Sequence, residues 1–400
     1  MRTTRGARAV PVAVALAVAA FSGCQASGSG EPTSGSSSST GSTAVASSSH
    51  SPRPSATPAH PGKPQVIVKN LDVPWGVAFL PNDAALVSER NTHKIKRIAP
   101  GGKVTTVGKV SGVTDDTSEG GLLGLALSPT YDLDHLVYAY ITTDTGNRIV
   151  RFRYDKRGIS RQESVFTGIP KATIHDGGRI KFGPDGMLYV TTGDATRAER
   201  AQDPKYLGGK VLRMTPDGEP VPGNPFSDSV VWTVGHRNPQ GLAWGPGKDP
   251  TLYEAEFGQN ALDEVNALHP GENYGWPDVE GTIGPKKEKF TPPLVTWPTD
   301  KASPSGLAYA ADSLWLATLQ GENVYRMRVH GDGSVGKPRA LLDDRYGRLR
   351  TIVTAPDGSL WVTTSNRDGR GSPTKSDDRI IRIPLHQKGS PTSPSPTGSV

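Results

Sequence analysis

The amino-acid sequence predicts an all-β fold, a six-bladed β-propeller of four-stranded antiparallel blades preceded by a disordered linker. Helical periodicity is hard to find, and 47 glycines and 35 prolines divide the chain into many short strands. One pattern recurs six times: an apolar strand, a turn rich in Pro, Asp and Gly, and a second strand, often of the form Leu-aromatic-Val. The spacing of these units, about 45 to 65 residues, fits a four-stranded propeller blade.

The six repeats are in register with one another. In the third repeat the strand 180–182 follows Gly178, and the turn Pro184-Asp185-Gly186 leads into the strand 188–190. Pro fixes φ and Gly permits φ > 0, so this turn favours a hairpin. A third strand that alternates apolar and charged residues follows in most repeats, at 94–98, 148–152, 211–214, 324–327 and 379–383. A sandwich of unrelated hairpins is the alternative, and six matches in register argue against it.

The N-terminus is expected to lie outside the fold. Basic residues precede an apolar run at 9–21 that is too short to span a bilayer comfortably, which is typical of a secretory signal. The run ends in Phe21-Ser22-Gly23-Cys24, which resembles a bacterial lipobox although Phe21 replaces the usual leucine. We therefore expect a lipoprotein signal peptide at 1–23 and lipidation of Cys24, the only cysteine. The alternative is an ordinary signal peptide with an incidental cysteine.

Composition divides the remaining chain into a folded part and two tails. Residues 24–64 are rich in Ser, Gly, Thr and Pro and nearly lack large apolar residues, so we expect a disordered tether. A similar tail is expected at 388–400, which leaves 65–387 for the propeller. These features predict a secreted protein anchored to the outer face of the cell membrane, in contact with the membrane through its lipid only.

Charge and motifs exclude several function classes. The formal net charge is +6, and the basic residues are scattered without a run that would indicate nucleic-acid binding. The chain has no histidine pair at zinc spacing, no phosphate-binding loop and no nucleophile elbow. Nucleic acid is therefore not an expected partner.

The polar residues that precede the six first strands are expected to meet at one mouth of the central channel. The first strand of each blade lines that channel, so the segments leading into these strands converge. They supply Glu119, His175, His236, Arg237, Asn238, Arg348 and Arg350. Arginines suit an anionic ligand, because a guanidinium pairs with carboxylates in a bidentate manner. Ordinary surface charges are the alternative, and His236 is interpreted as a buttress of its turn.

His175 and Asp194 are candidates for an acid–base pair. Asp194 follows the second strand of the third blade and is placed to turn back towards His175. A carboxylate on one imidazole nitrogen fixes the tautomer and raises the basicity of the other nitrogen. The alternatives are that His175 caps a turn and that Asp194 is a turn residue.

Several acidic stretches are less specific. The segments 263–266 and 271–277 offer the carboxylates and turn carbonyls that calcium prefers, although the residues alone favour a solvated loop. The pairs at 115–116, 343–344 and 377–378 are expected to be exposed turns.

Six motifs resemble those of the soluble quinoprotein glucose and aldose sugar dehydrogenases, which use pyrroloquinoline quinone (PQQ). The resemblance covers nearly all of residues 70–385 and is most specific at Gly235-His236-Arg237-Asn238-Pro239-Gln240-Gly241-Leu242-Ala243. The other motifs lie at 120–124, 175–179, 263–266, 273–277 and 348–350. The family fold is a six-bladed propeller, in agreement with the repeat count.

The resemblance implies a role for each matching residue. His175 matches the base that takes the proton of the anomeric hydroxyl, and Asp194 the acid that orients it. Hydride leaves the same carbon for the quinone and the product is a lactone. Residues matching PQQ contacts are Glu119, Arg237, Asn238, Gln320, Arg348 and Arg350. Residues matching calcium sites are Gly258 and Gln259, through backbone carbonyls beside PQQ, and Glu264 and Tyr274, at a structural site.

Three positions depart from the family pattern. Glu119 replaces a glutamine, Gln320 replaces a lysine that anchors the quinone, and Gln259 replaces a proline. A carboxylate at Glu119 is unfavourable beside an anionic cofactor unless it is protonated or paired.

We therefore expect a PQQ- and calcium-dependent enzyme that oxidises an aldose sugar and passes electrons to an unknown acceptor, as a monomer or homodimer. One alternative is a non-catalytic cell-surface propeller that binds a glycan or a protein, which Glu119 and Gln320 favour. Another is a metal-dependent lactonase, which an arginine-rich mouth disfavours.

Overall fold

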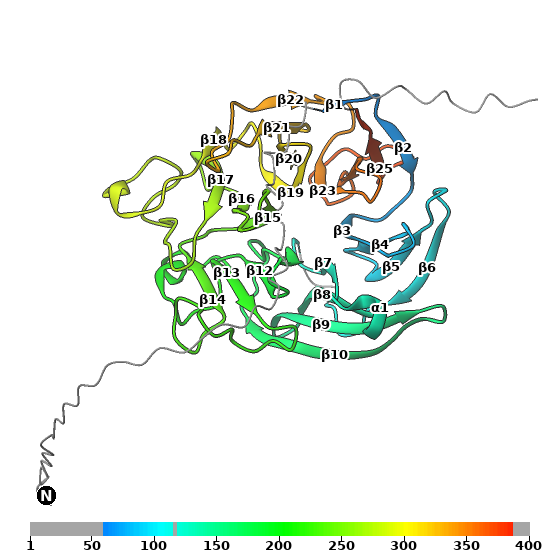
Figure 1. Ribbon diagram of the computed structural model, residues 1–400, viewed down its shortest axis with the longest axis horizontal. Coiled ribbons are helices and arrows are strands. Elements are labelled where there is room, and N and C mark those ends of the chain that lie inside the picture. Colours follow the sequence, from blue (N-terminus) through cyan, green and yellow to red (C-terminus); the bar gives the residue numbers. More distant parts are fainter. Residues whose placement is uncertain (1–58, 115–117, 387–400) are drawn as a thin grey trace, which may run out of the picture. The chain divides into compact units, whose positions relative to one another are not determined.

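The computed structural model describes residues 59–114 and 118–386. The expected signal peptide at 1–23, Cys24, the tether as far as residue 58, Asp115, Asp116 and the tail at 388–400 lie outside the described residues. Six four-stranded antiparallel sheets follow one another around a centre, which confirms the predicted propeller (Figure 1). No helix in 59–114 or 118–386 is long and apolar enough to cross a membrane.

Each blade begins with its innermost strand. Blade one contains β3 (Pro74–Phe79), β4 (Ala85–Glu89), β5 (Lys94–Ile98) and β6 (Val104–Lys109). Blade two contains β7 (Leu122–Leu127), β8 (Leu136–Thr143), β9 (Gly146–Asp155) and β10 (Gly158–Ile169), with the short helix α1 (Tyr131–Asp134) after β7. Blade three contains β11 (Ile180–Phe182), β12 (Leu188–Thr192), β13 (Lys210–Met214) and β14 (Val231–Val234), with the 3-10 turn η1 (Ala198–Gln202) after β12.

The remaining blades follow the same order. Blade four contains β15 (Pro239–Trp244), β16 (Leu252–Glu256), β17 (Leu262–Leu268) and β18 (Val295–Pro298), with η2 (Lys287–Lys289) in a long excursion before β18. Blade five contains β19 (Pro304–Ala310), β20 (Ser313–Thr318), β21 (Val324–Arg328) and β22 (Arg339–Leu341). Blade six contains β23 (Leu349–Thr354), β24 (Leu360–Thr364), β25 (Ile380–Ile383) and β2 (Gln65–Val68).

The two ends of the described chain close the ring together. β2 comes from the N-terminal side and pairs with β25, with Gln65 opposite Arg382. The short strands β1 (His60–Pro61) and β26 (Leu385–His386) pair beside them. Because blade six draws strands from both ends, opening the ring requires breaking a complete strand pairing.

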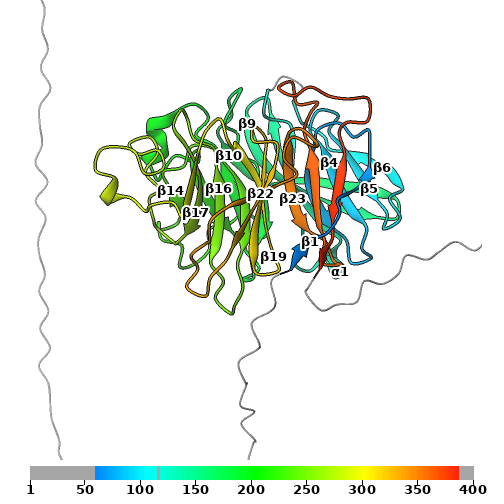
Figure 2. The ribbon, with the colours of Figure 1, turned by 90° about the horizontal axis from the view of Figure 1, so that it is seen from above.

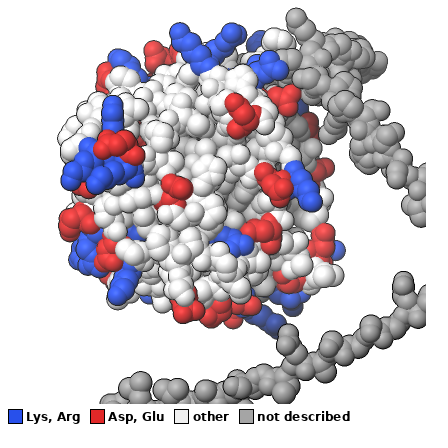
Figure 3. Space-filling view, turned by 60° about the vertical axis from the view of Figure 1, so that its left-hand side comes forward, with Lys and Arg blue, Asp and Glu red and all other residues white. Residues whose placement is uncertain are grey.

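Apolar side chains fill the spaces between neighbouring blades. Trp75, Tyr138, Tyr140 and Trp315 are among the largest fully buried side chains. The inner strand β3 is almost wholly buried, whereas the outer strand β6 is mostly exposed. On the side of the molecule seen in Figure 3, acidic and basic side chains are interspersed without a continuous basic surface.

Two of the sequence-based expectations are wrong. The segment 263–266 is not a solvated loop but lies within the buried strand β17. Asp377 and Asp378 are also buried, whereas Asp343 and Asp344 lie in an exposed turn as expected. The reason is that backbone amides distant in sequence bind these carboxylates: Asp378, for example, accepts hydrogen bonds from the N–H groups of Val73 and Asn366.

Candidate active site

The segments before the first strands of blades two and six meet around a small cavity at one end of the central channel, together with residues that follow second strands. The cavity is lined by Arg90, Ser118, Glu119, Gln240, Phe257, Leu319, Arg348, Arg350, Asp368 and Arg370. The connection between β24 and β25, which carries Asp368 and Arg370, projects from the face opposite α1 (Figure 2). The structure thus brings Glu119 together with Arg348 and Arg350, from two segments far apart in sequence.

His175 and Asp194 form a buried hydrogen-bonded pair. Nδ1 of His175 lies 2.8 Å from Oδ1 of Asp194, whose side chain is 1% exposed. The carboxylate also accepts hydrogen bonds from the backbone N–H of Thr196 and from Nε1 of Trp276, each at 2.8 Å. With three donors around it, Asp194 has one orientation, and it selects the tautomer in which Nδ1 carries the proton.

The other ring nitrogen of His175 is left available. Nε2 makes no hydrogen bond to any residue in 59–114 or 118–386. In the tautomer that Asp194 selects, Nε2 bears a lone pair, which is what a general base needs.

The backbone at His175 is in the left-handed region, with φ 65°. This conformation is uncommon for a residue with a side chain. Gly193 makes it possible, since a Cβ there would lie 1.9 Å from the carbonyl oxygen of His175. The close approach of these two segments therefore explains why a glycine stands directly before Asp194.

Arg348 and Arg350 share one carboxylate. Oδ2 of Asp368 lies 3.0 Å from Nε of Arg348 and 3.2 Å from a terminal nitrogen of Arg350. Burial lowers the pKa of Arg350 to about 10. Burial opposes ionisation of Asp368 as well, but the charges of Arg350 and Arg348 outweigh it and lower the pKa of this carboxyl. Two guanidiniums on one acid leave a positive charge for a ligand.

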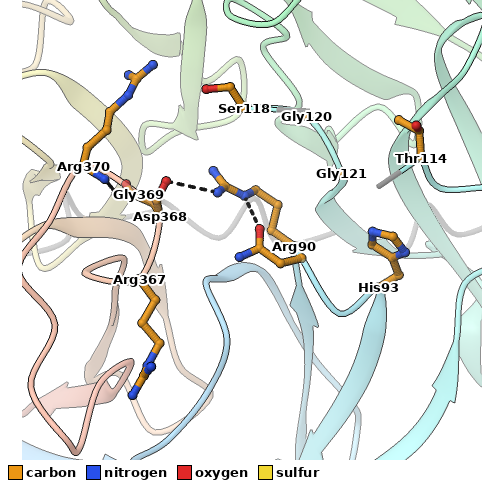
Figure 4. A pocket seen from close by; sticks show the side chains of 11 residues that line it. Arg90, His93, Thr114, Ser118, Gly120, Gly121, Arg367, Asp368, Gly369 and Arg370 are labelled. Carbon is orange, nitrogen blue, oxygen red and sulfur yellow. Dashed lines mark hydrogen bonds between the residues drawn. The ribbon is translucent and has the colours of Figure 1, made fainter. Parts of the chain in front are cut away.

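Arg90 adds a third buried guanidinium, which the sequence interpretation missed. Its Nε donates to Asn91 at 3.0 Å and one terminal nitrogen donates to the backbone carbonyl of Asp368 at 3.4 Å. Figure 4 shows this guanidinium between Asp368 and Ser118. Beside it opens a cavity of about 450 Å³ that His93, Thr114, Arg367 and Arg370 help to line.

Arg90, Asp368 and Arg370 follow second strands, whereas the sequence interpretation concentrated on residues before first strands. In an antiparallel blade the start of the first strand and the end of the second lie at the same end of the sheet. Asp194 is predicted at the mouth because it follows the second strand of blade three. The equivalent positions after the second strands of blades one and six are occupied by Arg90 and Asp368.

Arg237 and Asn238 do not line the arginine-rich cavity; Arg237 lines a neighbouring one with Gly258 and Trp276. The guanidinium of Arg237 lies 5.6 Å from the ring centre of Trp276 and donates to the carbonyl of Gly258 at 2.7 Å and to Gln259 Oε1 at 2.7 Å. Asn238 accepts the N–H of Gly177 through Oδ1 at 3.1 Å.

His236 acts as the expected buttress. Its ring lies between Thr233 and Glu256, at 2.9 and 2.8 Å, and stacks on Tyr274. The ring is fully buried.

Glu119 and Gln320, the two departures at the mouth, differ in surroundings. Glu119 is paired: its Oε1 lies 2.8 Å from a terminal nitrogen of Arg370, and its Oε2 accepts the N–H of His175 at 2.9 Å. Gln320 follows β20, and its exposed side chain makes no hydrogen bond within the described residues. Its neighbour Leu319 lines the cavity instead.

A second acidic cluster lies within blade four, on the second and third strands. Glu254 and Glu256 with His236 offer ligand atoms within 4.8 Å of one another. Burial, with the nearby charge of Glu256, raises the pKa of Glu264 to about 8, and burial also raises the pKa of Glu254. Glu254 Oε1 and Asn266 Oδ1 are buried without a hydrogen-bond partner among the described residues. Uncompensated oxygens of this kind suit a hard cation.

The turn that carries Gly258 and Gln259 is shaped by Glu280, which the sequence interpretation did not single out. Oε1 of Glu280 accepts the N–H groups of residues 259, 260, 261 and 262 at 2.6 to 3.2 Å. The N–H of Gly258 binds Asp263 at 2.8 Å. Two carboxylates thus hold the turn and set the directions of its carbonyls.

Comparison with known proteins identifies the family. Residues 71–381 match the glucose / sorbosone dehydrogenase family. The chain belongs to this family. An aldose sugar dehydrogenase of Escherichia coli is 30% identical over 343 residues, which cover 76% of this chain and 90% of that protein. Quinoprotein glucose dehydrogenase B of Acinetobacter calcoaceticus is 35% identical over 255 residues, which cover 54% of this chain and 52% of that protein.

A solved family member has the same fold. The PQQ-bound form of the aldose sugar dehydrogenase of Streptomyces coelicolor is 48% identical, with a TM-score of 0.78, and the match covers 83% of this chain and all of that one. That structure contains PQQ, so the residues of this glucose / sorbosone dehydrogenase family member can be tested for their fit to an anionic quinone.

The mouth fits such a group by charge. Four guanidiniums and two carboxylates line the cavity, so positive charge is in excess. Both carboxylates are already paired with arginine. PQQ carries three carboxylates, which a cationic, partly buried site accommodates. The cluster in blade four likewise fits calcium, through Glu264 and its buried neighbours. Tyr274 would contribute only its carbonyl, because its hydroxyl is bound to Ala267 and His269.

Proposed function

We propose that this protein is a PQQ-dependent aldose sugar dehydrogenase that oxidises the anomeric C–OH of its substrate to a lactone. The observation that carries the proposal is the His175–Asp194 pair. Nε2 of His175 makes no hydrogen bond to a described residue, and the backbone N–H of His175 binds Glu119, which lines the arginine-rich cavity. The names of the solved Streptomyces coelicolor relative and of the Escherichia coli relative support the cofactor and the substrate class.

Each residue of the mouth has a role in this proposal. PQQ, when bound, supplies the acceptor for the hydride that leaves the anomeric carbon. His175 Nε2 accepts the proton of the anomeric hydroxyl, and Asp194 stabilises the imidazolium that results. Arg348 and Arg350 hold cofactor carboxylates, while Arg237 and Asn238 contact its edge.

Calcium has two proposed positions. The backbone carbonyls of Gly258 and Gln259 would hold one calcium beside the cofactor once the carbonyl of Gly258 is released from Arg237, and Glu264 with the carbonyl of Tyr274 would form a structural site. Calcium beside the quinone would polarise it as a Lewis acid. The buried oxygens of Glu254 and Asn266 that have no described partner support a cation in blade four.

The decisive experiment is an optical titration of the cofactor-free protein with PQQ, with and without calcium. We expect saturable binding and, with an artificial electron acceptor, oxidation of aldoses that His175→Ala abolishes. No turnover over a broad panel of sugars would refute the proposal. Sugar or protein binding without PQQ affinity would instead favour a non-catalytic surface propeller.

We also propose that the chain is anchored outside the cell through lipidated Cys24. Support comes from the apolar run at 9–21 and the single cysteine that follows it. Labelling of cells with radioactive palmitate should mark the wild type and not Cys24→Ser. A soluble, unlabelled wild-type protein would contradict the anchor.

A further inference from the structure

We propose that Glu119 is a positioning residue for the base His175, and that Arg370 makes its charge compatible with an anionic cofactor. The charge role of Arg370 rests on the proposed binding of PQQ, whereas the positioning of His175 by Glu119 does not. It replaces the role that the family resemblance implies for this position, a direct contact to PQQ.

Glu119 holds the backbone of His175. Glu119 accepts the N–H of His175 at 2.9 Å, and its own N–H donates to the carbonyl of Thr173 at 3.1 Å. The two segments are therefore joined by a reciprocal pair of hydrogen bonds.

This pair acts where the chain is strained. His175 has φ 65°, an unfavourable conformation for a residue with a side chain, which persists only when its surroundings impose it. Asp194 holds the imidazole, and Glu119 holds the peptide group that sets the position of its Cα. The base is thus fixed at both ends.

Arg370 balances the charge of Glu119. Oε1 of Glu119 lies 2.8 Å from a terminal nitrogen of Arg370, whose side chain is 52% exposed while that of Glu119 is 18% exposed. Arg370 comes from blade six and reaches across the mouth to the segment before β7. An unpaired carboxylate here would repel a bound anion, whereas the ion pair presents no net charge to it.

The positioning role can be measured without the cofactor. In cofactor-free protein, hydrogen exchange of the peptide that contains His175 should be about tenfold faster in Glu119→Ala, because a hydrogen bond to a charged acceptor is lost. Glu119→Gln keeps an acceptor oxygen and should restore protection. Arg370 holds the other oxygen of the Glu119 carboxylate, so Arg370→Gln should also increase exchange in the wild-type background. It should have no such effect in the Glu119→Gln background, where this ion pair is already absent. Unchanged exchange in Glu119→Ala would overturn the positioning role.

The charge role is measured by PQQ titration. Arg370→Gln should weaken PQQ binding about three- to tenfold, and the double variant Glu119→Gln/Arg370→Gln should return to within about twofold of wild type. The matched control is Lys375→Gln, which removes one positive charge from an exposed position on the same connection and lines neither cavity of the mouth. Equal affinity of Arg370→Gln and the double variant would overturn the compensation.

The two measurements separate this inference from the proposed function. A wild-type protein that binds no PQQ refutes the proposed function, and the exchange data still decide whether Glu119 and Arg370 position His175.

Discussion

Replacing Asp194 by asparagine tests how the base is oriented. The carboxylate is 1% exposed and accepts three hydrogen bonds at 2.8 Å, from His175, Thr196 and Trp276. An asparagine keeps only one oxygen. We expect this oxygen to occupy the Oδ1 position, where it accepts from both His175 and Thr196. Its amide group then faces the indole N–H of Trp276, so a donor meets a donor.

The magnitude follows from what is lost. Asp194→Asn removes the charge that stabilises the imidazolium and one charge-assisted hydrogen bond, together about 1.5 to 3 kcal/mol. A barrier higher by that amount lowers kcat about 10- to 160-fold. The PQQ affinity and the KM for sugar should change little, because the buried carboxylate of Asp194 accepts its hydrogen bonds from protein donors.

The assay is steady-state sugar oxidation with an artificial acceptor, after reconstitution with PQQ and calcium. The matched control is Asp249→Asn, an exposed residue for which we expect unchanged kcat. If Asp194→Asn binds PQQ normally and retains kcat within twofold of wild type, the carboxylate does not support the base and the reasoning is wrong.

Three further predictions concern stability and calcium. Burial raises the pKa of Asp176 to about 6, so the folded state binds more protons than the unfolded state between about pH 4 and 6 and stability falls as pH rises through that window. Asp176→Asn should therefore raise the melting temperature relative to wild type more at pH 8 than at pH 4. Lys210 donates to the carbonyls of residues 200, 201 and 208 at 3.2, 2.7 and 2.8 Å; Lys210→Met should cost about 3 kcal/mol in urea denaturation. Glu280→Ala frees four N–H groups and should weaken calcium binding about tenfold in a calorimetric titration, with Glu280→Gln intermediate.

Each of these has a control at an exposed residue. Asp249→Asn should show no pH-dependent gain in melting temperature, and Lys248→Met should leave the urea midpoint unchanged. Glu288 is exposed and, like Glu280, lies between β17 and β18, so Glu288→Gln should leave the calcium affinity unchanged. A constant difference across pH for Asp176→Asn, a loss below 1 kcal/mol for Lys210→Met, or wild-type calcium affinity for Glu280→Ala would contradict the corresponding argument.

The sequence alone determined the six-bladed architecture and several of the residues that line the mouth of the central channel. Strand period and turn chemistry are local properties, so six repeats in register were enough to predict six blades. Equivalent positions in a closed ring must converge, so the repeats alone predict that Glu119, Arg348 and Arg350 lie together. The pairing of His175 with Asp194 was predictable too, because both residues belong to one blade.

Only the tertiary structure decided which partners balance the buried charges. Arg370 reaches Glu119 from the last blade, and Asp368 joins Arg348 to Arg350. The strand that contains Asp263 and Glu264 looked like a solvated loop, since its carboxylates are polar and the amides that bind them come from residues 258, 281 and 303. A sequence pattern reports the polarity of each residue, but burial of a charge depends on partners that only the closed ring brings into contact.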